Sequence, residues 1–163
     1  MPQRVYISDS NIWIDFRFAG LLDVLFGLPF VCASTDFVLA ELHDPSSTEL
    51  LERGLVVEPL SESSVLQLFA LMAEHNNSSL ADVSCYLVAR EQGYPLLTGD
   101  GRLRKKASKE GIEVHGALWL LDQLIAHEMI TPLRAADGLR LMRANNARLP
   151  RDECEARLTM WLA

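Results

Sequence analysis

Val5-Tyr6-Ile7-Ser8-Asp9-Ser10-Asn11 is the stretch from which the fold of this sequence can be worked out. Its three leading residues are apolar and β-prone, which predicts a short buried strand. The polar residues that follow predict a turn, and apolar residues then recur with helical spacing over 12–26, interrupted at Gly20. The chain therefore begins with a strand, a turn and a helix, and Asp9 lies at the carboxyl end of the strand.

The same alternation of strand and helix continues along the chain. Five strands that alternate with helices favour an α/β fold with a parallel sheet covered on both faces. Pro132 and Pro150 each predict the first position of a later helix, so that the chain ends in a helical tail. The further strands are expected at 30–33, 55–58, 95–98 and 112–114, and the helices between them at 35–42, 61–74, 79–93, 102–109 and 117–127.

The composition predicts a single globular domain that stays in the cytoplasm. The length of 163 residues suits one domain, and 49% apolar with 23% charged residues excludes a disordered chain. No apolar run is long enough to cross a bilayer, and no signal-peptide core precedes the first acid. The three cysteines are odd in number and include no C-x-x-C pair, so we expect them to be buried apolar side chains.

Acidic and basic residues are segregated along the chain. The net charge of -7 conceals that residues 1–100 carry 4 Lys or Arg against 14 Asp or Glu, whereas residues 101–163 carry 11 against 8. Such a chain can hold a divalent metal at its carboxylates and phosphates at its cations. Two solvated faces of opposite charge are the simpler interpretation of the same pattern.

Two acids follow strands of the expected sheet. Asp9 follows the first strand and Asp100 follows the fourth. In a parallel sheet both would lie at the same edge, where the ligands of open α/β sheets bind. An aspartate after a strand also serves as a turn or helix-capping residue, and each of these two acids alone has that simpler explanation.

Two further acids are expected on helices. On a helical wheel Glu41 lies between Phe37 and Val38, within the arc that should face the core, where a carboxylate needs a cation, a hydrogen-bond network or a raised pKa. A structural salt bridge would also satisfy Glu41. Asp82 opens a helix that is apolar almost all round, and with Ser79 it matches a capping box, which is a structural role for the same acid.

Four acids that a sheet edge and helix ends can bring together indicate a shared cation, because clustered carboxylates repel one another. Mg²⁺ and Mn²⁺ suit such a site, since they take oxygen ligands and keep waters beside a substrate phosphate. The chemistry that uses this arrangement is hydrolysis of a phosphodiester bond. The sequence lacks the motifs of serine hydrolases, zinc proteases, dinucleotide-binding proteins and P-loop proteins.

At these positions the sequence resembles the PIN-domain nucleases, the family that includes the VapC-like ribonuclease toxins of bacterial toxin–antitoxin pairs. The resemblance implies a sheet of order 3-2-1-4-5 and a Mg²⁺- or Mn²⁺-dependent endoribonuclease that cuts single-stranded RNA. Four stretches carry it, in this order: Ile7-Ser8-Asp9-Ser10-Asn11, residues 35–42 with Glu41, Leu80-Ala81-Asp82, and Leu96-Leu97-Thr98-Gly99-Asp100-Gly101-Arg102-Leu103-Arg104.

The resemblance also implies the roles of individual residues. Asn11 and Thr98 would orient a carboxylate or water, although an Asx turn for Asn11 and a strand hydroxyl for Thr98 are simpler roles. We expect a PIN-like nuclease domain over 1–127, with a helical extension packed on it over 128–163. The acids that would bind the metal and carry the catalysis are Asp9, Glu41, Asp82 and Asp100.

A basic run follows Asp100 directly. Its best candidates for holding an RNA phosphate are Arg102, Arg104 and Lys105. Arg102 leads because the planar guanidinium fork donates two hydrogen bonds to a phosphate. A solvated helix face explains the other cations of the run equally well. The tail arginines that would extend the same RNA track are Arg134, Arg140, Arg143, Arg148 and Arg151.

The tail is longer than a compact toxin needs. Its apolar residues would cover the domain, form a homodimer face or receive an antitoxin helix, and packing within the monomer is the simplest of the three. The alternative to a nuclease is an inactive PIN-like module that binds nucleic acid or a protein partner. The apolar residues in question are Leu133, Leu139, Leu141, Met142, Trp161 and Leu162.

Overall fold

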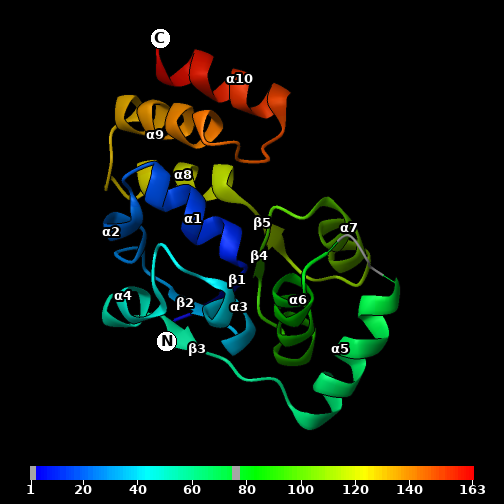
Figure 1. Cartoon of the computed structure of the whole chain (residues 1–163). Coiled ribbons are helices and arrows are strands. Elements are labelled where there is room, and N and C mark those ends of the chain that lie inside the picture. The colour runs from blue at the N-terminus through cyan, green and yellow to red at the C-terminus, as the bar shows by residue number, and fades with distance from the viewer. Residues whose placement is uncertain (1–2, 75–77) are drawn as a thin grey trace.

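A five-stranded parallel sheet forms the centre of the protein in a computed structural model that describes residues 3–74 and 78–163 (Figure 1). Every neighbouring pair of strands is parallel, and their order across the sheet is β3-β2-β1-β4-β5. The predicted fold class and sheet order are therefore confirmed. The strands are β1 (Val5–Ser8), β2 (Val31–Ser34), β3 (Val56–Val57), β4 (Leu96–Leu97) and β5 (Val114–His115).

Helices follow each strand and continue beyond the last one. They are α1 (Ser10–Phe18), α2 (Leu22–Leu25), α3 (Asp36–Glu41), α4 (Ser47–Glu52), α5 (Glu62–Glu74), α6 (Leu80–Gln92), α7 (Gly101–Lys109), α8 (Ala117–Ala126), α9 (Pro132–Ala144) and α10 (Arg151–Trp161).

The helix boundaries differ from the expected ones where a cap decides them. The first helix begins at Ser10 because Asp9 caps it, and a turn at Gly20, whose φ is +69°, separates α1 from α2. The sequence did not predict α4, which is a short helix capped by Ser46. Pro150 is the residue before α10 and not its first helical position.

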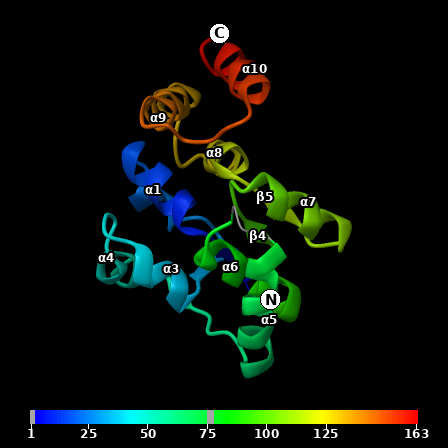
Figure 2. The same cartoon turned by 45° about the vertical axis from the view of Figure 1, so that its right-hand side comes forward.

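The helices cover both faces of the sheet. On one face α6 packs against β1 and β4, with α5 and α7 beside it. On the other face α1 contacts α8, and Figures 1 and 2 both show this pair across the sheet from α6. Residues 83–89 of α6 are all buried, as its apolar sequence predicts.

A buried hydrogen-bond chain joins the first helix to the sheet. The indole Nε1 of Trp13 donates to the Ser34 hydroxyl at 2.9 Å, and that hydroxyl donates to the Ser8 carbonyl at 2.7 Å. All three groups are paired although they lie in the core. This arrangement fixes the start of α1, and with it the residues near Asp9, against β1 and β2.

The C-terminal helices pack on the layer formed by α1 and α8. α9 contacts both of these helices, and α10 lies against α9, as Figures 1 and 2 show. Arg157 of α10 donates to both carboxylate oxygens of Asp122 on α8, with a shortest distance of 2.7 Å. The division of the chain at 127 and 128 stays a prediction.

The apolar tail residues named above divide into two sets. Leu139, Met142 and Trp161 are buried, whereas Leu133, Leu141 and Leu162 are exposed. The cysteines Cys32, Cys85 and Cys154 are free and buried, as predicted. No helix within the described part of the chain is long and apolar enough to cross a membrane.

Candidate active site

Asp9 is buried at the carboxyl end of β1, where it caps α1. Its Oδ1 accepts a hydrogen bond from the N–H of Ile12 at 3.1 Å, and its Oδ2 accepts from the Thr98 hydroxyl at 2.8 Å and the N–H of Gly99 at 3.3 Å. Burial, together with the charge of Asp82, raises the pKa of Asp9 to about 7. Asp9 therefore caps α1 and also lies near enough to Asp82 for the two charges to interact.

Asp100 caps α7 at the end of the neighbouring strand. Its Oδ1 accepts from the N–H groups of Arg102 at 2.9 Å and Leu103 at 3.1 Å, and its Oδ2 accepts from the Ser78 hydroxyl at 2.6 Å. The N–H of Asp100 donates to the hydroxyl of Thr98 at 3.1 Å. Because β1 and β4 are adjacent and parallel, Thr98 lies between the two strand-end acids.

Asp82 lies in the first turn of α6 and forms the expected capping box. Its N–H donates to the Ser79 hydroxyl at 3.0 Å, and its Oδ2 accepts from the Ser79 N–H at 3.4 Å. Burial raises the pKa of Asp82, and the nearby charges of Asp100 and Glu41 raise it further. Asp82 therefore caps α6 and still lies near enough to Asp100 and Glu41 for their charges to act on it.

Glu41 does not face the core, and the expectation that it does is wrong. The residue is exposed, and Val38 is the buried position of its helix. The helix is only six residues long and ends at Glu41. Fewer of its positions therefore pack against the core than a helical wheel of a longer helix indicates. The hydroxyl of Ser10 donates to Oε1 of Glu41. In the described part of the chain Glu41 makes no ion pair, so the salt-bridge alternative finds no partner there.

A hollow of about 270 Å³ is lined by two of the four predicted acids, Asp82 and Asp100, and by one acid that the sequence did not indicate. Asp15 lines it together with Asp82 and Asp100, and burial raises the pKa of Asp15 to about 6. The spacing of Asn11 and Asp15, four residues apart on α1, is the signal that could have indicated it. Asn11 lines the same hollow, but it is exposed and makes no side-chain hydrogen bond to an acid among the described residues.

The C-terminal part of the chain completes this hollow. Its wall includes residues 145–148, which connect α9 to α10. The tail therefore contributes to the wall of the hollow, a contribution that the sequence alone did not indicate. Arg148 supplies the cation of this segment.

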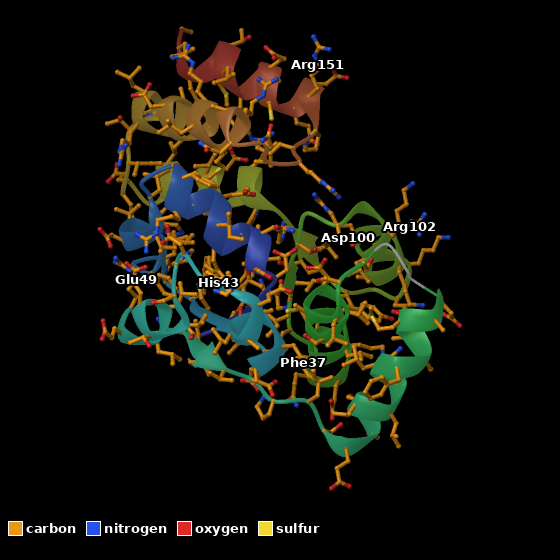
Figure 3. All side chains as sticks on the ribbon, viewed as in Figure 1. Phe37, His43, Glu49, Asp100, Arg102 and Arg151 are labelled. Atoms are coloured by element: carbon orange, nitrogen blue, oxygen red, sulfur yellow. The ribbon has the colours of Figure 1, made fainter. Side chains whose placement is uncertain are left out.

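The three predicted phosphate-binding residues are divided between two places. Figure 3 shows Asp100 and Arg102 close to the start of α7. Arg102 and Lys105, together with Asp100 and Arg148, line a hollow of about 390 Å³. Arg104 instead lines a separate cavity beside the start of α8. Residues three apart share one face of a helix, which explains why Arg102 and Lys105 stay together while Arg104 points elsewhere.

The acids suit a hard divalent cation in donor type and charge. Within residues 3–74 and 78–163, no three acidic, histidine or cysteine side chains converge into a group that could hold a metal ion. Mg²⁺ commonly uses one or two carboxylates and completes its shell with waters and substrate phosphate, so it does not require such a closed group. Burial raises the pKa of Asp9 and of Asp82, the charges of neighbouring carboxylates raise both further, and a cation would relieve that repulsion.

The chain belongs to the PIN-domain family, because residues 5–161 match the family model described as DUF3368, a PIN domain. Among solved structures it is similar to a PilT N-terminus domain protein from the hyperthermophilic archaeon Sulfolobus solfataricus P2. The TM-score is 0.52 and the sequence identity 16%, over 72% of this chain and 91% of that chain, so this likeness concerns the fold. No curated protein matches the sequence. PIN domains are generally nucleases and typically use divalent metals.

Proposed function

We propose that this protein is a metal-dependent endoribonuclease that hydrolyses phosphodiester bonds of single-stranded RNA. Asp9, Glu41, Asp82 and Asp100 are its catalytic acids. The observation that carries the proposal is geometric: Asp82 and Asp100 line one hollow, and Thr98 links Asp100 to the buried Asp9 at the edge where β1 and β4 end. Burial raises the pKa of Asp9 and of Asp82, and the charges of neighbouring acids raise both further.

The metal of this proposal is Mg²⁺ or Mn²⁺. When bound, such an ion lowers the pKa of a bound water and stabilises the charge on the leaving oxygen. Asp100 and Asp82 would hold it from the hollow that they line, and Thr98 links Asp100 to the buried Asp9. The hydrogen bonds from Thr98 and Gly99 keep Oδ2 of Asp9 in one orientation, and those from the start of α7 do the same for Asp100.

The substrate of this proposal is an RNA strand whose phosphates pass the start of α7. Arg102 and Lys105 border the hollow that also contains Asp100, so that a phosphate bound there would lie beside the acids. Guanidinium and ammonium groups at such a position neutralise the backbone without reading its sequence. This arrangement supports a nuclease whose affinity comes from backbone contacts.

We further propose that the protein acts in the cytoplasm as the toxin of a toxin–antitoxin pair. The apolar side chains of Leu133, Leu141 and Leu162 are exposed on the tail, and they offer a surface for an antitoxin or for a second copy of the chain. Expression of the protein should arrest growth, and coexpression of the product of a small adjacent reading frame should relieve that arrest. Growth unaffected by expression of an RNA-cleaving protein would contradict the toxin role.

The nuclease proposal is tested by incubating purified protein with a mixed RNA pool in Mn²⁺, Mg²⁺ or EDTA. Cleavage should require a metal and should be lost in the Asp9→Asn, Asp100→Asn double variant. An Asp23→Asn, Asp137→Asn double variant, which changes two acids outside the hollow, should cut as the wild type does. No cleavage with either metal, together with no metal-induced rise in Tm, would favour the inactive binding module instead.

A further inference from the structure

A second cavity, of about 210 Å³, lies where β4 and β5 end and α8 begins. Thr98 and Gly99 form one part of its wall, and His115 and Gly116 form another. Gly99 and Arg148 line both this cavity and the hollow that contains Asp82 and Asp100. The two sites are therefore neighbours along the same edge of the sheet.

Three arginines line this cavity and only one carboxylate does, so their positive charge is incompletely matched. Arg104 is partly buried and Arg148 is exposed, and in the described part of the chain neither side chain makes an ion pair or hydrogen bond. Arg157 also lines the cavity but is held by Asp122 at 2.7 Å. Glu153 is the carboxylate in the wall, and it lies 3.8 Å from Arg157. The charges of Arg104 and Arg148 are thus available to bind an anionic ligand.

The start of α8 adds backbone donors to the same cavity. Gly116 precedes this ten-residue helix and provides no side-chain cap for its first N–H groups. A Cβ atom built on Gly116 would lie 3.3 Å from Nη1 of Arg104, so the guanidinium group sits directly over the start of the helix. Guanidinium groups and uncapped helix N–H groups both favour an anion, and a phosphate suits their combination.

We propose that this cavity binds a phosphate of the RNA strand, and that this phosphate is a different one from the phosphate that is cut. The inference rests on the proposed function, since it takes RNA as the substrate. The shared wall at Gly99 and Arg148 lets one strand run from the acids to the start of α8. The cavity therefore fixes the position of the strand relative to the acids, with Arg104 and Arg148 as its binding residues.

The proposal is tested by RNA binding without cleavage. The anisotropy of a labelled single-stranded oligonucleotide is measured in EDTA for the wild type, Arg104→Gln and Arg148→Gln. Each substitution should weaken binding by about tenfold and lower the slope of log affinity against log salt by about one, as the loss of one phosphate contact requires. Arg90→Gln is the matched control, because Arg90 lies near the end of α6 that points away from the acids.

A second variant separates binding from folding. Gly116→Asp would place a carboxylate at the start of α8, where it can cap the helix and pair with Arg104. Its Tm should equal or exceed that of the wild type, while its RNA binding falls as far as that of Arg104→Gln. Gly116→Ala, which adds no charge, should bind nearly as well as the wild type.

The results distinguish this inference from the nuclease proposal. Weakened binding in both arginine variants and in Gly116→Asp supports the phosphate site even if no metal gives cleavage. Wild-type affinity and salt dependence in all three variants overturn it, whether or not the protein cleaves RNA. Oligonucleotides with and without a 5′-phosphate identify which phosphate is bound. If the wild type prefers the 5′-phosphorylated oligonucleotide and Arg104→Gln abolishes this preference, the cavity binds a terminal phosphate. If the wild type binds both oligonucleotides equally, the cavity binds an internal phosphate.

Discussion

The hydroxyl of Thr98 donates a hydrogen bond of 2.8 Å to Oδ2 of Asp9 and accepts one of 3.1 Å from the N–H of Asp100. One buried side chain therefore links the acids that follow β1 and β4. The hydroxyl is the acceptor for the N–H of Asp100, and it shares Oδ2 of Asp9 with the N–H of Gly99, so it helps to fix the positions of both acids.

Replacing Thr98 with valine should destabilise the fold. The change leaves an oxygen of Asp9 and the N–H of Asp100 without this partner, at a cost of about 1 to 3 kcal/mol in the free energy of unfolding. Urea denaturation of Thr98→Val measures this cost, and Thr98→Ser, which keeps the hydroxyl, is the control. Equal stability of Thr98→Val and the wild type would show that the hydroxyl does not hold the two acids.

Stability without metal should depend on pH through the buried acids. Their ordinary pKa is 3.8, and in the folded chain it is about 7 for Asp9 and about 6 for Asp15, with that of Asp82 also raised. Between these values the folded chain holds protons that the unfolded chain has released. The contribution of these raised pKa values to the free energy of unfolding is thus fully present below the ordinary pKa and is lost as pH rises through 6 and 7.

The measurement for this prediction is the Tm in EDTA across that pH range. The Tm should fall as pH rises, and Mn²⁺ or Mg²⁺ should oppose the fall at the upper end, because a cation stabilises the ionised carboxylates. Asp9→Asn removes one of the titrating groups and should show a shallower dependence. Parallel curves for Asp9→Asn and the wild type would contradict the assignment of the pH effect to Asp9.

Asp15 should contribute to metal affinity although the sequence analysis did not indicate it. Asp15 lines the hollow with Asp82 and Asp100, so Asp15→Asn removes one carboxylate from the surroundings of a bound cation. The metal concentration for half-maximal cleavage should rise by about tenfold, the size typical for a group that supports metal ligands. Asp137→Asn is the control, since this exposed acid of α9 lies outside the hollow. An unchanged metal requirement in Asp15→Asn would remove Asp15 from the site.

The close contact between α9 and the segment after α1 should be sensitive to side-chain size. A Cβ atom on Gly138 would lie 2.8 Å from Cδ1 of Leu21 and 3.4 Å from Cβ of Ala19. Gly138→Val should therefore destabilise the protein by about 1 to 3 kcal/mol, since the valine cannot fit without displacing α9. Arg140→Val puts the same side chain at an exposed position of the helix and should cost less.

Hydrogen exchange shows where that destabilisation acts. Amides of α9 and α10 should exchange faster in Gly138→Val, and cleavage should weaken as well, because residues 145–148 form a wall of the hollow. Uniform acceleration throughout the sheet would instead indicate that the tail unfolds together with the rest of the chain. The predicted boundary between 127 and 128 would then not separate two folding units.

The sequence by itself determined the alternation of strands and helices, apart from α4 and the break between α1 and α2, and the placement of the strand-end acids. Hydrophobic periodicity and helix caps act over a few residues, so they can be recognised in the sequence. Asp9 and Asp100 were predicted to share an edge because parallel strands present their carboxyl ends together, and the order of the strands in the sheet agrees with that prediction. The capping box of Ser79 and Asp82 was equally local.

Tertiary structure decided which side chains share a space. Glu41 was expected in the core but is exposed, because a six-residue helix packs through few positions. Arg104 and Arg102 line different cavities, because they lie on different faces of α7. Asp15 lines the same hollow as Asp82 and Asp100, and residues of the tail form part of the wall of that hollow. These contacts depend on how segments that are distant in the chain pack together. A local sequence pattern does not predict which distant side chains a given residue will contact.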